Sequence, residues 1–365
     1  MPRRPNRPPF AVLALAVLLV AAALPAFAAE ETRSFEKSFT ADAGERLRLA
    51  NLLGSVRLVA GDGDAVVVRA TAHVDAGDGE ENRKILSELG WVRDPDRRGG
   101  WALSYPVDRY RTFTYPRSSG LLRWRGRSTT KFLGKRVTVA NAGGPVVYVD
   151  LEITYPARVP LGVRLSMGSV DGGDLYGDLD VDTGSADVTL ASFNGDLVID
   201  TGSGDVEVGA FHGDAGNLDT GSGDVTVGRV TAGKLRVDTG SGDVLLTDGE
   251  VGDLVVDTGS GSIRVDGVAV ETADLDTGSG DVLLRGALST ARRVIADTGS
   301  GDVEIYGGAD FTFEVSADQG SGDLEIGYDD AELRRDGRKL IGATRGAKRT
   351  RVSIDTGSGD AVVAP

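Results

Sequence analysis

A short string, D-T-G-S, recurs through the second half of this 365-residue chain at an almost fixed spacing. Its copies start at Asp182, Asp200, Asp219, Asp238, Asp257, Asp276, Asp297 and Asp355, and a variant, D-Q-G-S, starts at Asp318. Successive copies are 18, 19, 19, 19, 19, 21, 21 and 37 residues apart. Such a period is typical of a solenoid, because one repeat buries its apolar face only by stacking on its neighbours.

Each repeat predicts two short strands joined by a fixed corner. Leu235 and Val237 alternate with Arg236, and Val244 and Leu246 flank Leu245, which is the period of a strand. The T-G-S-G residues between them form the turn, where glycines accept positive φ and Asp or Ser side chains cap amides. The structural turn residues are Asp182, Gly184, Asp200, Gly202, Asp219, Gly221, Asp238, Gly240, Asp257, Gly259, Asp276, Gly278, Asp297, Gly299, Asp355 and Gly357.

The expected fold is therefore all-β: a single-chain parallel β-solenoid with coils of about 19 residues, about 4.8 Å apart. Chained antiparallel hairpins are the alternative, but a constant period and identical corners favour parallel stacking. Residues 166–365 hold the regular repeats, with a basic insertion at about 331–351. Residues 29–165 are expected to be a divergent start of the solenoid, in which Leu47–Leu49, Gly54–Leu58 and Val66–Ala70 form one coil, with a basic, loop-rich, aromatic insertion at about 78–144.

Residues 1–28 are typical of a signal peptide. Arg3, Arg4 and Arg7 precede an apolar run from Phe10 to Leu24, and A-x-A follows at Ala26–Ala28. No later stretch is apolar enough to span a bilayer. We expect an exported protein, periplasmic or at the cell surface or beyond it, with an uncleaved anchor as the alternative.

Charge is distributed unevenly along the chain. The net charge of −15 argues against nucleic acid as a partner. Residues 83–136, however, carry fourteen Lys and Arg against four acids, and all three tryptophans lie within them. Arg and aromatic side chains suit anionic glycan or protein surfaces. The candidate contact residues are Trp101, Tyr105, Arg109, Tyr110, Arg111, Tyr115, Arg117, Trp124, Arg125 and Arg127.

Stacking aligns the aspartates into ladders. Ca²⁺ prefers carboxylate oxygens, so the ladder of Asp200, Asp205, Asp219, Asp224, Asp238 and Asp243 is a conceivable calcium site. The simpler interpretation is that each Asp caps its own turn, and no cofactor or metal is expected. D-T-G-S is also the aspartic protease signature, but that enzyme needs two distant copies, one per lobe. No acid and base residues converge, so we expect no enzyme.

Several segments resemble a known family. Asn51–Leu58 (N-L-L-G-S-V-R-L), Ile153–Pro156 (I-T-Y-P), Gly168–Leu175 (G-S-V-D-G-G-D-L) and the D-T-G-S-G-D-V corners are similar to the bacterial putative-adhesin family of exported β-strand-repeat domains of unknown function. The resemblance covers roughly 46–75 and 146–365 and implies an exported β-solenoid. The basic aromatic insertion departs from the family pattern.

The sequence predicts a non-enzymatic, adhesin-like or envelope-associated binding module with an unidentified envelope or surface ligand. A periplasmic scaffold or self-associating rod is the first alternative. A polysaccharide-active β-helix enzyme is the second.

Overall fold

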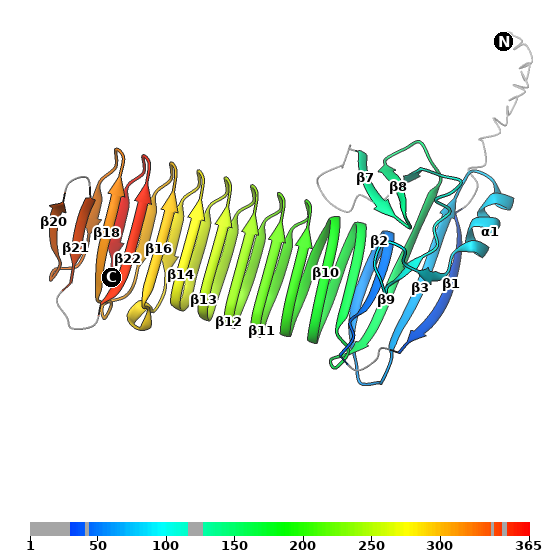
Figure 1. Ribbon diagram of the computed structural model, residues 1–365, viewed down its shortest axis with the longest axis horizontal. Coiled ribbons are helices and arrows are strands. Elements are labelled where there is room, and N and C mark those ends of the chain that lie inside the picture. Colours follow the sequence, from blue (N-terminus) through cyan, green and yellow to red (C-terminus); the bar gives the residue numbers. More distant parts are fainter. Residues whose placement is uncertain (1–29, 41–43, 116–126, 337–338, 345–348) are drawn as a thin grey trace, which may run out of the picture.

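The computed structural model describes residues 30–40, 44–115, 127–336, 339–344 and 349–365. It is a long rod with a wider head at the N-terminal end (Figure 1). All of the described strands belong to one continuous sheet. The predicted signal peptide, residues 1–28, lies outside the described residues. No helix of the described part is long and apolar enough to cross a membrane.

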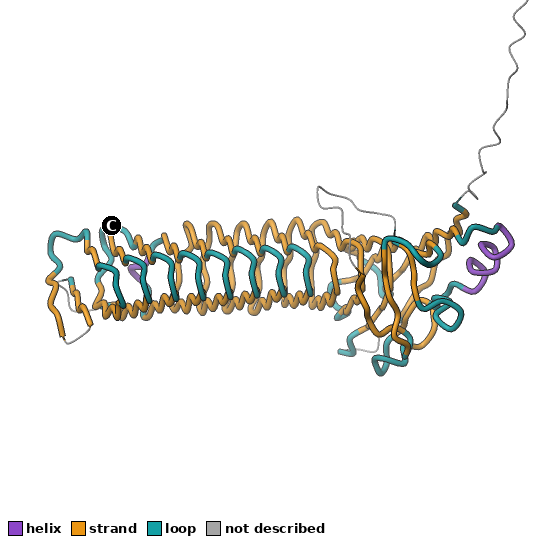
Figure 2. Tube along the Cα trace, turned by 90° about the horizontal axis from the view of Figure 1, so that it is seen from above, coloured by secondary structure: helices purple, strands orange, loops and turns teal. Residues whose placement is uncertain are grey.

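The rod is a parallel solenoid, as the sequence predicts. Its long strands run from one T-G-S-G corner to the next and bend at a variable corner between (Figure 2). Neighbouring coils pair in parallel with identical residues side by side, for example Asp238 beside Asp257 and Thr239 beside Thr258. The strands are β10 (Leu161–Thr201), β11 (Val206–Thr220), β12 (Val225–Thr239), β13 (Val244–Thr258), β14 (Ile263–Thr277), β15 (Val282–Arg285), β16 (Arg293–Thr298), β17 (Val303–Tyr306), β18 (Phe313–Gln319), β19 (Leu324–Ile326), β20 (Glu332–Asp336), β21 (Lys339–Ala343), β22 (Thr350–Thr356) and β23 (Ala361–Ala364).

The core of the rod follows the alternation of the sequence. In β12 the buried positions form three apolar pairs, Val225 with Val227, Val230 with Ala232, and Leu235 with Val237. A short 3₁₀ turn, η1 (Leu288–Thr290), replaces part of one strand and still buries Leu288. Each coil closes the apolar faces of the next, which is why no repeat is stable alone.

A buried threonine holds each D-T-G-S corner, a role that the sequence interpretation missed. The Thr239 hydroxyl donates to the carbonyl of Gly223 in the preceding coil (3.0 Å) and accepts from the Gly242 amide in its own turn (3.1 Å). Thr220 and Thr258 repeat both bonds. Both hydroxyl roles are thus satisfied in the interior, where an unpaired polar group is costly.

The corner glycines are needed for close approach and not, as the sequence suggested, for positive φ. No corner glycine has a positive φ. A Cβ on Gly240 would lie 2.4 Å from the Gly221 carbonyl oxygen, and one on Gly242 would lie 1.8 Å from that of Gly223. Any side chain there would push the coils apart.

The coils do not stack in chain order at the far end. The coil of β22 and β23 lies between that of β16 and β17 and that of β18 and β19, because β22 pairs with both β16 and β18. Likewise β23 pairs with both β17 and β19. The D-Q-G-S copy, which lacks the threonine, belongs to the outermost coil. The β20–β21 hairpin then pairs with β18 in antiparallel fashion (Figure 1).

The head is a mixed sheet. Strand β2 (Leu47–Gly61) continues the parallel stack beside β10, but β3 (Val66–Asp75) runs antiparallel to β9 (Val146–Pro156) and to β1 (Glu31–Phe39). The prediction that Val66–Ala70 completes a coil with β2 is therefore wrong: this segment reverses direction and pairs with β1 and β9.

The insertion is packed rather than loop-rich. It contains α1 (Gly79–Glu88), β4 (Trp91–Arg93), β5 (Trp101–Leu103), β6 (Thr112–Thr114), β7 (Arg127–Phe132) and β8 (Lys135–Ala140). Asp78 caps α1 by accepting from the amides of Glu80 and Glu81. Ile85, Phe113 and Phe132 are fully buried, so these elements extend the core of the head.

The position of the β22–β23 coil between two earlier coils can be tested. The protein has no cysteine, so Glu304→Cys with Val362→Cys creates a single pair on neighbouring strands in register. We expect this pair to form a disulfide under mild oxidation, because parallel neighbours lie about 4.8 Å apart. Non-reducing peptide mapping reads the result.

The matched control is Glu304→Cys with Glu325→Cys, two coils apart at roughly 10 Å, which is too far for a disulfide. A disulfide in the control pair and none in the first would mean that the coils stack in chain order.

The threonine ladder predicts a stability effect. Thr239→Val keeps the shape but leaves the Gly242 amide and the Gly223 carbonyl without their partner. We expect a loss of about 1–3 kcal/mol, seen as a lower thermal midpoint. Thr226→Val, on the outward face of the same strand, is the control and should change the midpoint little. Equal effects would exclude a special role for the buried hydroxyl.

Candidate functional site

The structure separates the seven predicted contact residues that it describes. Tyr105 is only 4% exposed, so it cannot contact a ligand directly. Its hydroxyl donates to Asn51 Oδ1 (2.8 Å), and its ring packs edge-on against Phe113 and Phe132. Burial raises the pKa of Tyr105 well above its usual value, which keeps the hydroxyl protonated as a donor. Tyr105 anchors the insertion to the head.

Three other candidates serve the internal packing of the head. Arg109 binds both carboxylate oxygens of Glu88 (3.1 and 2.7 Å), and Tyr110 donates to Glu81 Oε1 (3.1 Å), so both fasten α1. Tyr115 packs edge-on against Tyr148.

The remaining candidates are dispersed. Arg111 and Arg127 are exposed, with Arg127 at the start of β7. Arg117, Trp124 and Arg125 lie outside the described residues. Of the described candidates, only Trp101 borders a large hollow of the surface.

That hollow, which we call the cationic groove, has a volume of about 930 Å³. It lies between the end of β1, the start of β2 and the β4–β5 hairpin. Its lining residues are Lys37, Ser38, Phe39, Thr40, Glu45, Arg46, Leu47, Arg93, Arg98, Gly99 and Trp101.

Trp101 organises the charges of the groove. The Lys37 ammonium and the Arg93 guanidinium each lie 4.0 Å from the Trp101 ring centre. The indole is therefore contacted by two cations from different strands, β1 and β4. Each cation is attracted by the ring quadrupole. Phe39 packs edge-on against Trp101 (5.5 Å) and fixes the ring from below.

Three cations of the groove have no carboxylate partner. Within the described residues, no ion pair joins Lys37, Arg93 or Arg98 to an acid, whereas Arg46 binds Asp178 (2.7 Å) and Asp180 (2.9 Å). In a chain of net charge −15, unpaired cations around one hollow mark a site for negative charge. The excess of basic residues in the insertion included Arg93 and Arg98, but no sequence signal pointed to Lys37 on β1.

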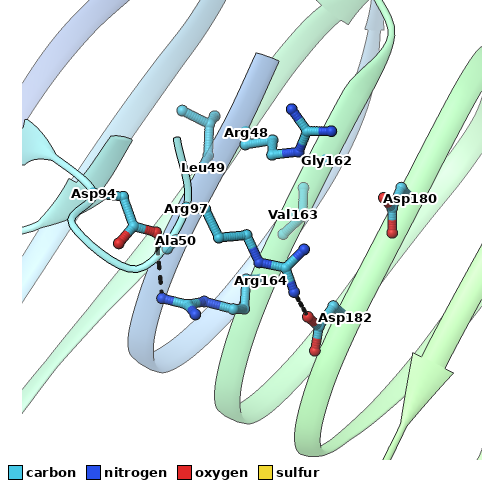
Figure 3. Close-up of a pocket in the computed structure, with 10 residues that line it drawn as sticks. All are labelled: Arg48, Leu49, Ala50, Asp94, Arg97, Gly162, Val163, Arg164, Asp180 and Asp182. Carbon is cyan, nitrogen blue, oxygen red and sulfur yellow. Dashed lines mark hydrogen bonds and ion pairs between the residues drawn. The ribbon is translucent and has the colours of Figure 1, made fainter. Parts of the chain in front are cut away.

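A second cluster of charges lies beside the groove and is structural (Figure 3). Arg97 pairs with Asp182 of the first D-T-G-S corner, and Arg164 pairs with Asp94 (3.3 Å). The space among these residues is only about 20 Å³, little more than one water molecule. These ion pairs join the β4–β5 hairpin to the rod and fix one wall of the groove.

The rod carries two aspartate ladders with different roles. Asp205, Asp224 and Asp243 each accept from the backbone amide at the same position of the next coil (2.8–2.9 Å). They therefore link coils, whereas the sequence interpretation had each Asp cap its own turn.

The ladder of the first D-T-G-S residue is repulsive. Burial first, and then neighbouring carboxylates, raise the pKa of Asp200, Asp219, Asp276 and Asp297 above the ordinary 3.8. Among the described residues, no group of three or more His, Asp or Glu is arranged to hold a metal ion. The absence of a cofactor stays a prediction.

The fold defines the class of the protein. It is an all-β solenoid whose head combines a mixed sheet with a helix. The model of the family described as Toastrack DUF4097 matches residues 163–364, more than half of the chain. The protein therefore belongs to this Toastrack family. No curated protein matches the chain.

Three solved structures are similar to the chain over most of its length. They are a putative cell adhesion protein from Clostridium sporogenes (9% identity, TM-score 0.18), a putative lipid binding protein from Parabacteroides distasonis (13%, 0.36) and a putative adhesin from Bacteroides fragilis (11%, 0.33). They cover 92, 91 and 91% of this chain and 99, 96 and 97% of their own. At such identities and TM-scores they carry no argument about function.

The repulsive ladder predicts a pH-dependent gain of stability. A carboxylate whose pKa is raised by folding destabilises the folded state at pH values above that pKa, where it is ionised. Asp276→Asn should therefore raise the free energy of unfolding at pH 7 by about 0.5 kcal/mol for an exposed group, seen as a higher thermal midpoint. The gain should shrink as the pH falls through the raised pKa, where Asp276 itself becomes neutral.

The control is Asp266→Asn. Asp266 pairs with Arg264 (2.7 Å) and Arg285 (3.7 Å), so its neutralisation should lower the midpoint at pH 7. A loss of stability in Asp276→Asn would contradict the repulsive ladder.

Proposed function

We propose that this protein is a non-enzymatic binding module of the bacterial cell envelope, which engages negatively charged groups through the cationic groove of its head. The observation that carries the proposal is the arrangement of Lys37, Arg93 and Arg98 around Trp101, without acid partners among the described residues. The residues 1–28 support export, since they have the three parts of a signal peptide.

The rigid rod supports a binding role rather than catalysis. Its outward strand positions mix Glu207, Thr226, Leu245 and Arg264. A hollow of the rod holds His212 beside acids such as Asp196 and Asp214, but no hydrogen bond or ion pair among the described residues joins them. Catalysis needs such groups held within hydrogen-bond reach of one reacting centre. A rod of stacked coils instead sets a fixed distance between its head and its far end.

The proposal is tested by binding of the labelled protein to envelope preparations. Lys37→Gln, Arg93→Gln and Arg98→Gln together remove three charges from the groove. We expect affinity to fall about tenfold or more, as three screened ionic contacts are lost. Raising the salt concentration should weaken the wild type in the same direction.

A matched variant keeps the net charge equal. Arg229→Gln, Arg293→Gln and Arg351→Gln neutralise three exposed arginines of the rod that have no ion-pair partner among the described residues. This variant should bind like the wild type. If both triple variants bind equally well, or both lose binding equally, the groove is not the binding site and the proposal is abandoned.

A further inference from the structure

The composition of the cationic groove goes beyond a general preference for anions. Besides its cations it carries exposed hydroxyls at Ser38 and Thr40 and an exposed carboxylate at Glu45. None of these three side chains forms a hydrogen bond with another described residue. The groove therefore presents donors and acceptors for neutral hydroxyl groups beside charges for acidic ones.

We propose that the groove binds a segment of a linear acidic polysaccharide built from carboxylate-bearing sugars. This inference rests on the proposed function and names the ligand class of the same site. Lys37 and Arg93, each 4.0 Å from the Trp101 ring centre, bind sugar carboxylates. Arg98, in the connection between β4 and β5, adds a third positive group.

The Glu45 carboxylate distinguishes a sugar acid from a bare polyanion. It accepts hydrogen bonds from sugar hydroxyls, which a phosphate chain does not offer, and it repels phosphate. Ser38 and Thr40 donate to and accept from ring and hydroxyl oxygens. The Trp101 indole N–H, for which the described residues supply no acceptor, adds one more donor.

The groove does not suit a lipid. Phe39 and Leu47 are 4% and 6% exposed, and the partly exposed Trp101 ring is contacted by Lys37 and Arg93, so no open apolar floor receives an acyl chain. The rod beside it is strongly acidic, with 34 acids against seven bases between residues 166 and 330. An anionic bilayer would repel that surface, whereas a single polymer chain reaches the groove alone.

The volume of the cationic groove fits a segment of a polysaccharide. About 930 Å³ is at the upper end of ordinary ligand pockets, and the hollow is open to solvent. An oligosaccharide of a few residues occupies such a hollow, while the rest of the polymer extends away from the head.

The experiment is calorimetric titration of the exported chain with short oligogalacturonides. We expect a dissociation constant in the micromolar range, about tenfold weaker in the Lys37→Gln, Arg93→Gln, Arg98→Gln variant and unchanged in the Arg229→Gln, Arg293→Gln, Arg351→Gln variant. Neutral cello-oligosaccharides of the same length should not bind. Circular dichroism melting confirms that each variant is folded.

Glu45→Gln is expected to change the affinities for oligogalacturonides and for polyphosphate in opposite directions. Loss of the carboxylate should weaken oligogalacturonide binding, because a strong acceptor for sugar hydroxyls is lost. The same substitution should strengthen any binding of inorganic polyphosphate, because repulsion is removed. Equal strengthening of both would show that only charge is recognised, and would overturn the polysaccharide assignment.

Binding to phosphatidylglycerol vesicles is the last measurement. Groove-dependent binding of vesicles without binding of oligogalacturonides overturns the inference in favour of a lipid headgroup. Groove-dependent envelope binding with no affinity for oligogalacturonides overturns the ligand class and leaves the proposed function standing. If the groove variant binds the envelope as well as the wild type does, both the ligand class and the proposed function are wrong.

Discussion

The contact on which the rod depends is between backbones, at the corner where one coil approaches the next. The carbonyl oxygen of one corner glycine occupies the place where the Cβ of the following one would be, as between Gly221 and Gly240. This constraint repeats once per coil and keeps the length of the corner constant. Length changes between repeats fall at the opposite, variable corner. Glycines approach the preceding coil there too, as Gly249 approaches the Val230 carbonyl, but they do not recur at one fixed position of every coil.

Polar groups along that corner are used in two opposite ways. The buried threonine satisfies a carbonyl of the preceding coil and an amide of its own, so each one links two coils without loss of hydrogen bonding. The exposed aspartate one residue earlier lies in a column of like charge, whose repulsion opposes stacking. The rod is thus stabilised by its interior and mildly strained at its surface, while that surface charge keeps it soluble.

The sequence predicted the coil better than the order of the coils. Alternation at Val225, Val227, Leu235 and Val237 was enough to place the core, because a strand has only two faces. The order at the far end was not predictable, since every coil presents the same corner and local pattern cannot choose among equivalent neighbours. The outermost coil is the one whose corner reads D-Q-G-S, with Gln319 in place of the threonine.

The residues of the candidate groove could be found from the sequence only in part, for a related reason. Composition marked the insertion as basic and aromatic, and Trp101 does line the groove. Composition cannot separate a buried aromatic such as Tyr105 from an exposed one, because both occur in the same stretch of sequence. Lys37 comes from β1, far away along the chain, and reaches Trp101 only through the fold of the head.

The inserted coil of β22 and β23 also has a consequence for synthesis. The coil of β18 and β19 leaves the ribosome earlier, yet its native neighbour does not exist until Thr350–Ala364 has been made. Domains otherwise fold from the N-terminus as they emerge. A chain interrupted before Thr350 leaves open strand edges at both sides of the gap, which are templates for aggregation. The far end of this rod is therefore completed by the coil of β22 and β23. Only a chain translated through that coil has the strand edges on both sides of the gap covered.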